Sequence, residues 1–346
     1  MNKDRLFCMS SYLQYRSIVD KNRCFSEHLP TWFYEETQER VPVNTFEELD
    51  KQLRRRINEA LENGPVALML SSGMDSAILA SYLPKGTQTY TLRCQATSGI
   101  DETQAAKYYA DKNGLKHRVI DVYWEDFEKY TVPLMRQKGY PIHSIEVQIY
   151  KAALQAQKDG IQTLIFGETA DIIYGGHSKL LAQEWTLDTF TERFAFVNPK
   201  HVLKQPMCID DPIRPYVRED GSVDVFGFLN GFEYGVSLGF YTNACRMAGV
   251  TLCAPYSYTI LGHALDITRI RSGESKYIIR ELYRQLYPEH SVPDKTPLPR
   301  PMEEWLSGWE GPKYSEFIWN PKISWTGDQK WYIYALDQFM RYVVEE

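Results

Sequence analysis

The sequence predicts an α/β protein that is built on a doubly wound parallel sheet and continues into a mostly helical half. Two observations lead to this prediction. Between residues 44 and 180, short apolar runs with turn-like flanks alternate with helical stretches, which is typical of a parallel sheet covered by helices. After about residue 177, aromatic-rich helical stretches dominate. We therefore expect an N-terminal extension at residues 1–43 and one domain at 44–346, divided into an α/β half (44–180) and a helical half (181–346).

The first clear helix begins at Thr45. Thr45 and Glu48 have the spacing of a capping box, in which each side chain accepts a hydrogen bond from the backbone of the other residue. Apolar residues then recur at helical spacing as far as Leu61, and Asn63-Gly64-Pro65 ends the helix.

Strands and further helices follow in alternation. Four short apolar runs predict strands at residues 66–70, 89–93, 117–122 and 163–166. Helical patterns begin near residue 77 and cover 103–112 and 146–158. Ligands of such sheets bind beyond the carboxyl ends of the strands, so the loops that follow the strands are the segments to search for a site.

Composition narrows the classes of function. The chain has 346 residues, 39 Lys+Arg and 45 Asp+Glu, for a net charge of -6, which argues against nucleic acid as the main partner. No apolar run approaches the roughly 20 residues of a membrane helix, and the start lacks the apolar stretch of a signal peptide, so we expect a cytoplasmic protein with no membrane partner. The six cysteines include no C-x-x-C pair, which argues against a zinc ribbon.

The loop after the first predicted strand is the strongest candidate site. A Ser- and Gly-rich loop between a strand and a helix presents backbone N–H groups at the positive end of the helix dipole, and such loops bind phosphate or pyrophosphate. Gly73 allows a ligand to approach the backbone, and an acid here suits a magnesium ion that bridges it to phosphate oxygens. The alternative is an ordinary turn with a serine cap. The candidate ligand-binding residues are Ser71, Ser72, Gly73, Asp75 and Ser76.

A second candidate loop follows the predicted strand at 163–166. It contains Gly167, Glu168 and Asp171, and it ends at Gly175-Gly176, which permits a sharp turn. Because parallel strands end at the same edge of a sheet, the Asp171 carboxylate is expected to reach the same Mg²⁺ ion as Asp75.

Both loops resemble motifs of one family. The first resembles the S-G-G-x-D-S pyrophosphate loop of the ATP pyrophosphatase (PP-loop) superfamily, with Ser72 in place of a glycine. The second resembles the G-E-G-A-D-E-x-F-G-G segment of asparagine synthetases and β-lactam synthetases, with Ile172 in place of an acid. The resemblance implies an adenine nucleotide α hydrolase-like fold that uses ATP and Mg²⁺ and cleaves ATP between the α and β phosphates. It also implies that Gly167 and Glu168 help to bind the nucleotide.

Weaker matches follow in the same order as in the family. Asp101-Glu102 resembles the start of the family's D-E-x-x-x-A helix, and the resemblance implies that the backbone at Leu92 contacts adenine. Residues 247–256 resemble a stretch near the family's substrate pocket, but Leu252 and Ala254 replace its usual Glu and Arg. Lys276 opens a segment that resembles the K-x-x-L-R helix.

Two residues are given catalytic roles because of their order among the family motifs and their sequence neighbours. Lys295 resembles the lysine that meets pyrophosphate and the acyl intermediate, where a point charge stabilises the leaving group. The alternative for Lys295 is a solvated side chain. Glu146, with His143 behind it, is the candidate base for the attacking amine, and the alternative for both is a place at a helix start.

The resemblance implies an ATP-dependent carbon–nitrogen ligase. Such an enzyme adenylates a carboxylate, releases pyrophosphate and transfers the acyl group to a nitrogen nucleophile, as in asparagine biosynthesis. The expected substrate is a small-molecule or peptide carboxylate, and the donor is ammonia, from solution or a separate glutaminase subunit, or an amine. No glutaminase domain is expected in the chain, because only about 44 residues precede the synthetase region.

Three alternatives remain open from the sequence. The first is an intramolecular amide former, like β-lactam synthetases or peptide cyclases. The second is a PP-loop enzyme that modifies tRNA or another nucleic acid, and the third is a non-catalytic nucleotide sensor.

Overall fold

The parallel sheet places two loops side by side at its centre. The computed structural model describes residues 1–37, 39–293 and 298–345. A five-stranded sheet has the order β6-β5-β4-β7-β8, and all its pairs are parallel. The strands are β4 (Val66–Met69), β5 (Gln88–Cys94), β6 (Lys116–Val122), β7 (Thr163–Ile165) and β8 (Thr251–Cys253). The predicted fold class and its four strands are confirmed, and β8 is a fifth strand that the sequence analysis missed.

The order of the strands reverses between β4 and β7. The chain runs outward from β4 to β5 and β6, then returns to place β7 on the other side of β4. Such a reversal opens a crevice at the carboxyl ends of the two central strands, where open α/β sheets bind ligands. The two candidate loops leave β4 and β7, so they meet at this crevice.

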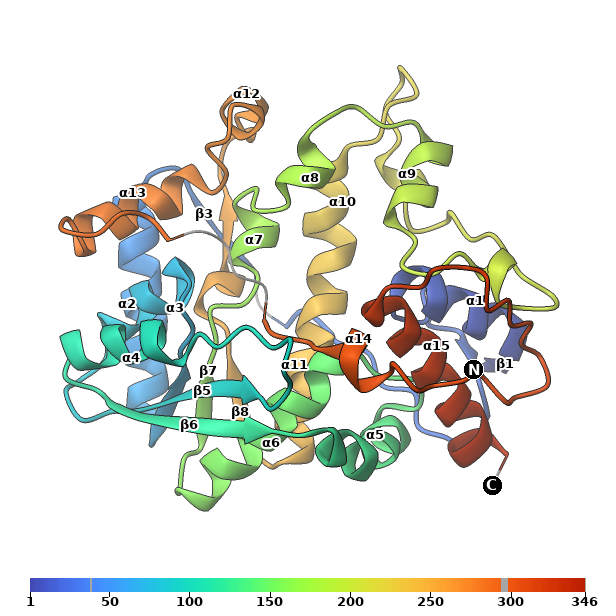
Figure 1. The fold of residues 1–346 in the computed structure, drawn as a ribbon. Helices are drawn as coiled ribbons and strands as arrows, with labels where there is room; N and C mark the ends of the chain where they lie inside the picture. The colour runs from blue at the N-terminus through green and yellow to red at the C-terminus, as the bar shows by residue number, and fades with distance from the viewer. Residues whose placement is uncertain (38, 294–297, 346) are drawn as a thin grey trace.

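Helices cover both faces of the sheet (Figure 1). The helices α3 (Met74–Ala80) and α4 (Thr103–Lys112) pack near β4, β5 and β6, with α2 (Phe46–Glu62) beside them. Half of the predicted capping box of α2 is present: Thr45 Oγ1 accepts a hydrogen bond from Glu48 N at 3.3 Å, whereas Glu48 Oε2 accepts from Asn44 N at 2.7 Å in place of Thr45 N. The helices α6 (Ser144–Lys158) and α11 (Tyr234–Met247) pack against each other and against β5, β6 and β8. Right-handed crossovers place these two groups of helices on opposite faces.

The second half is mostly helical, as expected. Its helix α13 (Tyr277–Leu286) packs back onto α2 and α3, so the second half contributes directly to the α/β half. The other elements outside the central sheet are α5 (Trp124–Lys138), α7 (Ala170–Ile173), α8 (Ser178–Leu181), α9 (Leu187–Phe194), α10 (Val225–Phe228), α12 (Ile267–Arg271), α14 (Met302–Trp305), α15 (Gly327–Phe339), the π-helices η3 (Leu229–Glu233) and η5 (Met340–Val344), and the short 3₁₀ helices η1 (Pro199–His201), η2 (Arg214–Tyr216) and η4 (Pro255–Tyr258).

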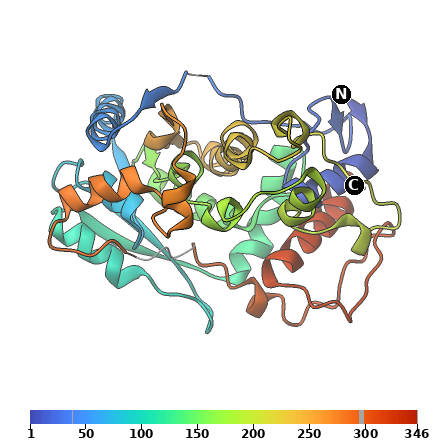
Figure 2. The same ribbon diagram turned by 90° about the horizontal axis from the view of Figure 1, so that it is seen from above.

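The N-terminal residues are an integral part of the fold. Helix α1 (Arg5–Tyr15) is buried from Phe7 to Tyr15 and packs against α15, and the two termini lie near each other (Figure 2). Tyr12 Oη donates a hydrogen bond of 2.8 Å to Ile142 O. The strands β1 (Asn2–Lys3) and β2 (Arg23–Cys24) pair with each other, and β3 (Val41–Val43) pairs with β9 (Thr259–Leu261).

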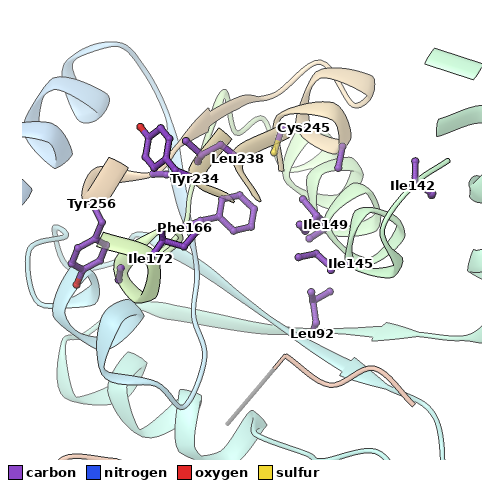
Figure 3. Close-up of a cluster of buried hydrophobic side chains, with 14 of the residues drawn as sticks. Leu92, Ile142, Ile145, Ile149, Phe166, Ile172, Tyr234, Leu238, Cys245 and Tyr256 are labelled. Carbon is purple, nitrogen blue, oxygen red and sulfur yellow. The ribbon is translucent and has the colours of Figure 1, made fainter. Parts of the chain in front are cut away.

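An apolar cluster fills the interface between the sheet and the helices α6 and α11. Figure 3 shows Leu92 of β5 and Phe166 after β7 facing side chains of these helices, including Ile149 and Leu238. Within the described parts of the chain, no helix combines the length and apolar character that crossing a membrane requires.

Candidate active site

Hydrogen bonds to serine side chains of the same loop stabilise the loop between β4 and α3. Ser71 N donates to Ser76 Oγ at 3.0 Å, and Gly73 N donates to Ser71 Oγ at 3.2 Å. The two hydroxyl groups of Ser71 and Ser76 lie 2.9 Å apart. Ser72 N donates to Glu102 Oε2 at 2.9 Å. The three loop N–H groups that were expected to face a ligand therefore have acceptors within the protein: two serine hydroxyl groups of the loop and the carboxylate of Glu102. The first turn of α3 presents further backbone donors to an anion.

Gly167 lets the end of β7 lie directly against α3. A methyl group added at Gly167 would come within 3.1 Å of Ser76 N and 3.2 Å of Asp75 Cβ. Contacts this short leave little room for any side chain. The glycine of the second motif thus fits the first turn of α3, which explains in physical terms why both motifs belong to one site.

Asp75 and Asp171 converge on a lysine. Lys276 Nζ donates a hydrogen bond to Asp75 Oδ2 at 2.6 Å and lies 3.0 Å from Asp171 Oδ1. Asp75 lies in the first turn of α3, Asp171 in α7 and Lys276 directly before α13. Three segments that are far apart in the sequence therefore meet at the carboxyl edge of the sheet. The predicted proximity of the two aspartates agrees with this geometry.

Backbone strain is concentrated around these three residues. Lys276 has φ 53° and Thr169 has φ 70°, and they are two of the three non-glycine residues with positive φ among those that the structure describes. Such conformations cost free energy for residues with a side chain, and they cluster at functional sites. Thr169 turns the chain between Glu168 and Asp171, and Lys276 turns its own side chain back toward α3.

The ammonium group of Lys276 remains charged. The residue is 5% exposed. Burial lowers the pKa of Lys276, but Asp75 and Asp171 raise it further, so the net pKa lies above its ordinary value. One positive charge thus faces two carboxylates, and the three groups together carry one negative charge. This arrangement favours a further cation.

The two carboxylates fit a magnesium ion that a nucleotide brings with it. Magnesium sites in nucleotide enzymes use one or two protein carboxylates and complete their octahedron with phosphate oxygens and water. Asp75 and Asp171 already share one cationic group, at 2.6 and 3.0 Å. Among the described residues, no group of three or more His, Cys, Asp or Glu side chains could hold a metal alone. The donor set therefore suits Mg²⁺ bound with phosphate rather than a free ion.

Glu168 lies beside this cluster with two hydroxyl groups around it. Ser237 Oγ donates to Glu168 Oε1 at 2.7 Å. Burial, followed by the charge of Glu168 and a hydrogen bond to it, raises the pKa of Tyr241 well above its ordinary value. Ser237 and Tyr241 are four residues apart on α11, so they lie on one face of that helix. The Glu168 carboxylate is half-buried and three residues from Asp171.

Leu92 can offer a ligand only its backbone. The residue lies in β5, two positions before the strand ends, and pairs with Ile120 of β6. Its side chain is 4% exposed and belongs to the apolar cluster of Figure 3. The predicted contact of its backbone with adenine remains a prediction.

Glu146 lies in a fully buried cluster of polar side chains. Its Oε1 accepts hydrogen bonds from Lys138 Nζ at 2.7 Å and His143 N at 2.8 Å, and its Oε2 accepts one from Asn243 Nδ2 at 2.7 Å. The side chains of Glu146 and Lys138 are both 0% exposed. Both carboxylate oxygens thus have internal donors, and His143 caps α6 by accepting from Ile145 N. A base for a bound amine has to be sought elsewhere.

Lys295 lies outside the described residues, but the chain just beyond it is anchored at the site. Pro299 O accepts hydrogen bonds from Gln148 Nε2 at 3.0 Å and from Cys94 Sγ at 3.3 Å. Cys94 is the last residue of β5, so this segment lies at the carboxyl edge of the sheet. Arg300 follows, with Nη2 at 3.1 Å from Asp328 Oδ2.

Sequence reasoning missed several residues of the site. Lys276 was noted only as part of a helix motif, and its match to K-x-x-L-R was the one signal that could have singled it out. Ser237 and Tyr241 carried no motif, and only their four-residue spacing indicates a shared helix face.

Gly176 provides a direct test of the position of Asp171. A methyl group added at Gly176 would lie 2.0 Å from Asp171 Oδ1 and 2.7 Å from its Cα. Gly176→Ala must therefore displace the carboxylate, and we expect turnover to fall on the order of 100-fold, as misplacement of a reacting group by about 1 Å can do. Steady-state kinetics would measure the loss. Gly308→Ala is the matched control, because nothing lies within 4 Å of its added methyl group. Full activity in Gly176→Ala would show that Asp171 is not needed in this position.

Comparison with known proteins identifies one family model. Residues 46–215 match the model described as asparagine synthase. No curated protein matches the chain in sequence. Two solved structures show remote similarity. A predicted subunit of a tRNA methyltransferase from Methanocaldococcus jannaschii has 14% identity and a TM-score of 0.23, with 65% of this chain and 86% of that chain covered. The U34-tRNA thiolase NcsA from Methanococcus maripaludis, with its [4Fe-4S] cluster, has 15% identity and a TM-score of 0.26, with 72% and 83% covered. Scores this low carry no argument about function.

Proposed function

Because the chain belongs to the asparagine synthase family through residues 46–215, we propose that it is an ATP-dependent amide-forming ligase. The family uses ATP, and its members are enzymes of the ATP pyrophosphatase type. In the proposed reaction a substrate carboxylate attacks the α phosphate, pyrophosphate leaves, and ammonia or an amine takes the acyl group from the adenylate. The observation that carries the proposal is the convergence of Asp75, Asp171 and Lys276 beside the first turn of α3.

In this proposal the first turn of α3 and Lys276 bind the triphosphate. The N-terminal end of a helix attracts anions through its unpaired N–H groups and its dipole. The buried ammonium group of Lys276 adds a full positive charge, which stabilises the charge that develops on pyrophosphate as it leaves. Asp75 and Asp171 would hold Mg²⁺, which when bound neutralises phosphate charge. Lys295 remains a proposed second lysine for the same anion.

Glu168 is our candidate for the group that accepts a proton from the nucleophile. Its carboxylate is half-buried, so a small amine can reach it, whereas that of Glu146 is fully enclosed. Ser237 Oγ holds one of its oxygens at 2.7 Å and so fixes its orientation. A positioned carboxylate within hydrogen-bond reach of an amine is what general base catalysis requires.

The carboxylate substrate is proposed only by class. Leu252 and Ala254 occupy positions at which the resemblance led us to expect a charged pair, and both are apolar. Ala254 is 3% exposed and Leu252 lies in β8. Without charged groups at these two positions, a dicarboxylate such as aspartate loses part of its expected recognition. A less polar carboxylate, free or at the end of a peptide, is the better fit.

ATP–pyrophosphate exchange tests the proposal. The protein is incubated with ATP, magnesium and labelled pyrophosphate, together with pools of small carboxylates, of peptides or of RNA. Exchange that requires a carboxylate is expected, and Asp75→Asn is expected to abolish it. Exchange that requires RNA would instead support a nucleic-acid-modifying enzyme. Tight ATP binding without exchange under any condition would support a nucleotide sensor and contradict the ligase.

A further inference from the structure

The carboxylate of Glu102 accepts hydrogen bonds from the loop between β4 and α3. Its Oε2 accepts a hydrogen bond from Ser72 N at 2.9 Å and another from Ser72 Oγ at 2.8 Å. A phosphate oxygen bound at a loop of this kind would accept the same pair of donors. Glu102 is 6% exposed, so the carboxylate is enclosed beside the loop.

This contact is not needed to begin helix α4. Glu102 occupies the N-cap position, but its side chain makes no capping hydrogen bond. Asp101 caps the helix instead, because its Oδ1 accepts a hydrogen bond from Thr103 N at 2.9 Å. The Glu102 side chain instead crosses to a residue that lies 30 positions earlier in the chain. An acid that serves only the helix dipole would have no reason to do so.

Ser72 is also the position at which the loop departs from S-G-G-x-D-S. A glycine there would keep the N–H group but lose the hydroxyl group, and with it one of the two hydrogen bonds to Glu102. The serine and the glutamate therefore form a matched pair. On its other side, Ser72 lines an open cavity of about 390 Å³ together with Ala105 and Tyr108, so the loop has room to shift.

We propose that Glu102 is a built-in competitor that occupies the phosphate-binding donors of Ser72 until the nucleotide displaces it. The proposal rests on the proposed function, since it assumes that this loop binds ATP. A bound triphosphate and a carboxylate repel each other, so both cannot hold the Ser72 donors at once. Glu102 is thus a positioning residue that weakens nucleotide binding and favours release of pyrophosphate.

Burial supports this role. Burial raises the pKa of Glu102, while the hydrogen bonds from Ser72 lower it in part and Asp101 raises it slightly. A carboxylate whose charged form is already disfavoured is easier to displace from its two donors than one that is stabilised by an ion pair.

The test measures the dissociation constants of ATP and of pyrophosphate by titration calorimetry. Glu102→Gln keeps the shape and removes the charge, so its competing hydrogen bonds are weaker, and we expect both ligands to bind about fivefold more tightly than to the wild type. Asp101→Asn is the matched control, because Asp101 is a neighbouring exposed acid whose side chain accepts from Thr103 N and not from Ser72. The dissociation constants of both ligands for this variant should stay within about twofold of the wild-type values.

The possible outcomes separate the two proposals. Tighter binding in Glu102→Gln, with Asp101→Asn unchanged, supports the competitor. Unchanged or weaker binding in Glu102→Gln overturns it, because a residue that only braces the loop would weaken binding when altered. If Glu102→Gln and Asp101→Asn both bind ATP and pyrophosphate more tightly to the same extent, general charge repulsion explains the effect. The proposal that Glu102 competes with the nucleotide is then overturned as well. Failure of the wild type to bind either ligand contradicts the proposed function and this inference together.

Discussion

Lys276→Met is expected to lower the rate of ATP–pyrophosphate exchange by about 1,000-fold. Removal of one preorganised donor that stabilises developing negative charge typically costs about 10²- to 10³-fold in rate. In this chain the loss is at the upper end, because the same ammonium group also bridges Asp75 at 2.6 Å and Asp171 at 3.0 Å. Without it, the two carboxylates repel each other and leave their positions. Exchange kinetics at saturating ATP would measure the effect.

Two further variants show whether the effect belongs to this site. Lys276→Arg keeps the charge but changes its shape, so it should recover part of the activity. Lys322→Met removes an exposed lysine from the surface and should leave exchange unchanged. Exchange in Lys276→Met within tenfold of the wild type would show that Lys276 has no direct part in the reaction.

Glu146→Ala is expected to destabilise the protein by about 3–5 kcal/mol. The substitution leaves the ammonium group of Lys138 buried without its carboxylate, and breaking a buried pair from one side typically costs this much. Both side chains are 0% exposed, so bulk water does not reach the ammonium group in the intact structure. Denaturant unfolding, with the midpoint and slope fitted together, would measure the change in the free energy of unfolding.

The controls for this prediction compare burial and charge. Asp111→Ala breaks the exposed pair with Lys107, whose side chains are 51% and 61% exposed, and should cost less than about 1 kcal/mol. The double variant Lys138→Met with Glu146→Leu removes both buried charges and should be more stable than Glu146→Ala, although His143 N and Asn243 Nδ2 still lose their acceptor. A loss in Glu146→Ala as small as that in Asp111→Ala would contradict the structural role assigned to Glu146.

The sequence predicted the central sheet because its strands have strong local signals. The runs that became β4, β5, β6 and β7 are apolar, short and bounded by turn residues. The strand β8 (Thr251–Cys253), which pairs with β7, was missed because residues 247–256 were interpreted only as a motif near the substrate pocket. Helix α1 was missed for a different reason. Every residue from Phe7 to Tyr15 is buried, so the helix lacks the solvent-exposed face that would give its sequence a helical period.

The site was predictable where a motif coincided with the end of a strand. Asp75, Gly167 and Asp171 lie shortly after the neighbouring strands β4 and β7, and the parallel order of the sheet brings them together. Lys276 comes from a segment about 100 residues later, and its position depends on a left-handed backbone turn that no local pattern predicts. For Glu146, no sequence pattern indicated that the side chain would be enclosed. Only the tertiary fold shows that Lys138, eight residues earlier, encloses it.

The products formed from ATP test the central claim most directly. The protein is incubated with ATP, magnesium, ammonium and a pool of carboxylates, and the phosphorus-containing products are separated and identified. Attack on the α phosphate beside Asp75 and Lys276 predicts AMP and pyrophosphate in equal amounts, with neither formed by Asp75→Asn. Formation of ADP and inorganic phosphate would mean that the γ phosphate is the one attacked, and it would contradict the account.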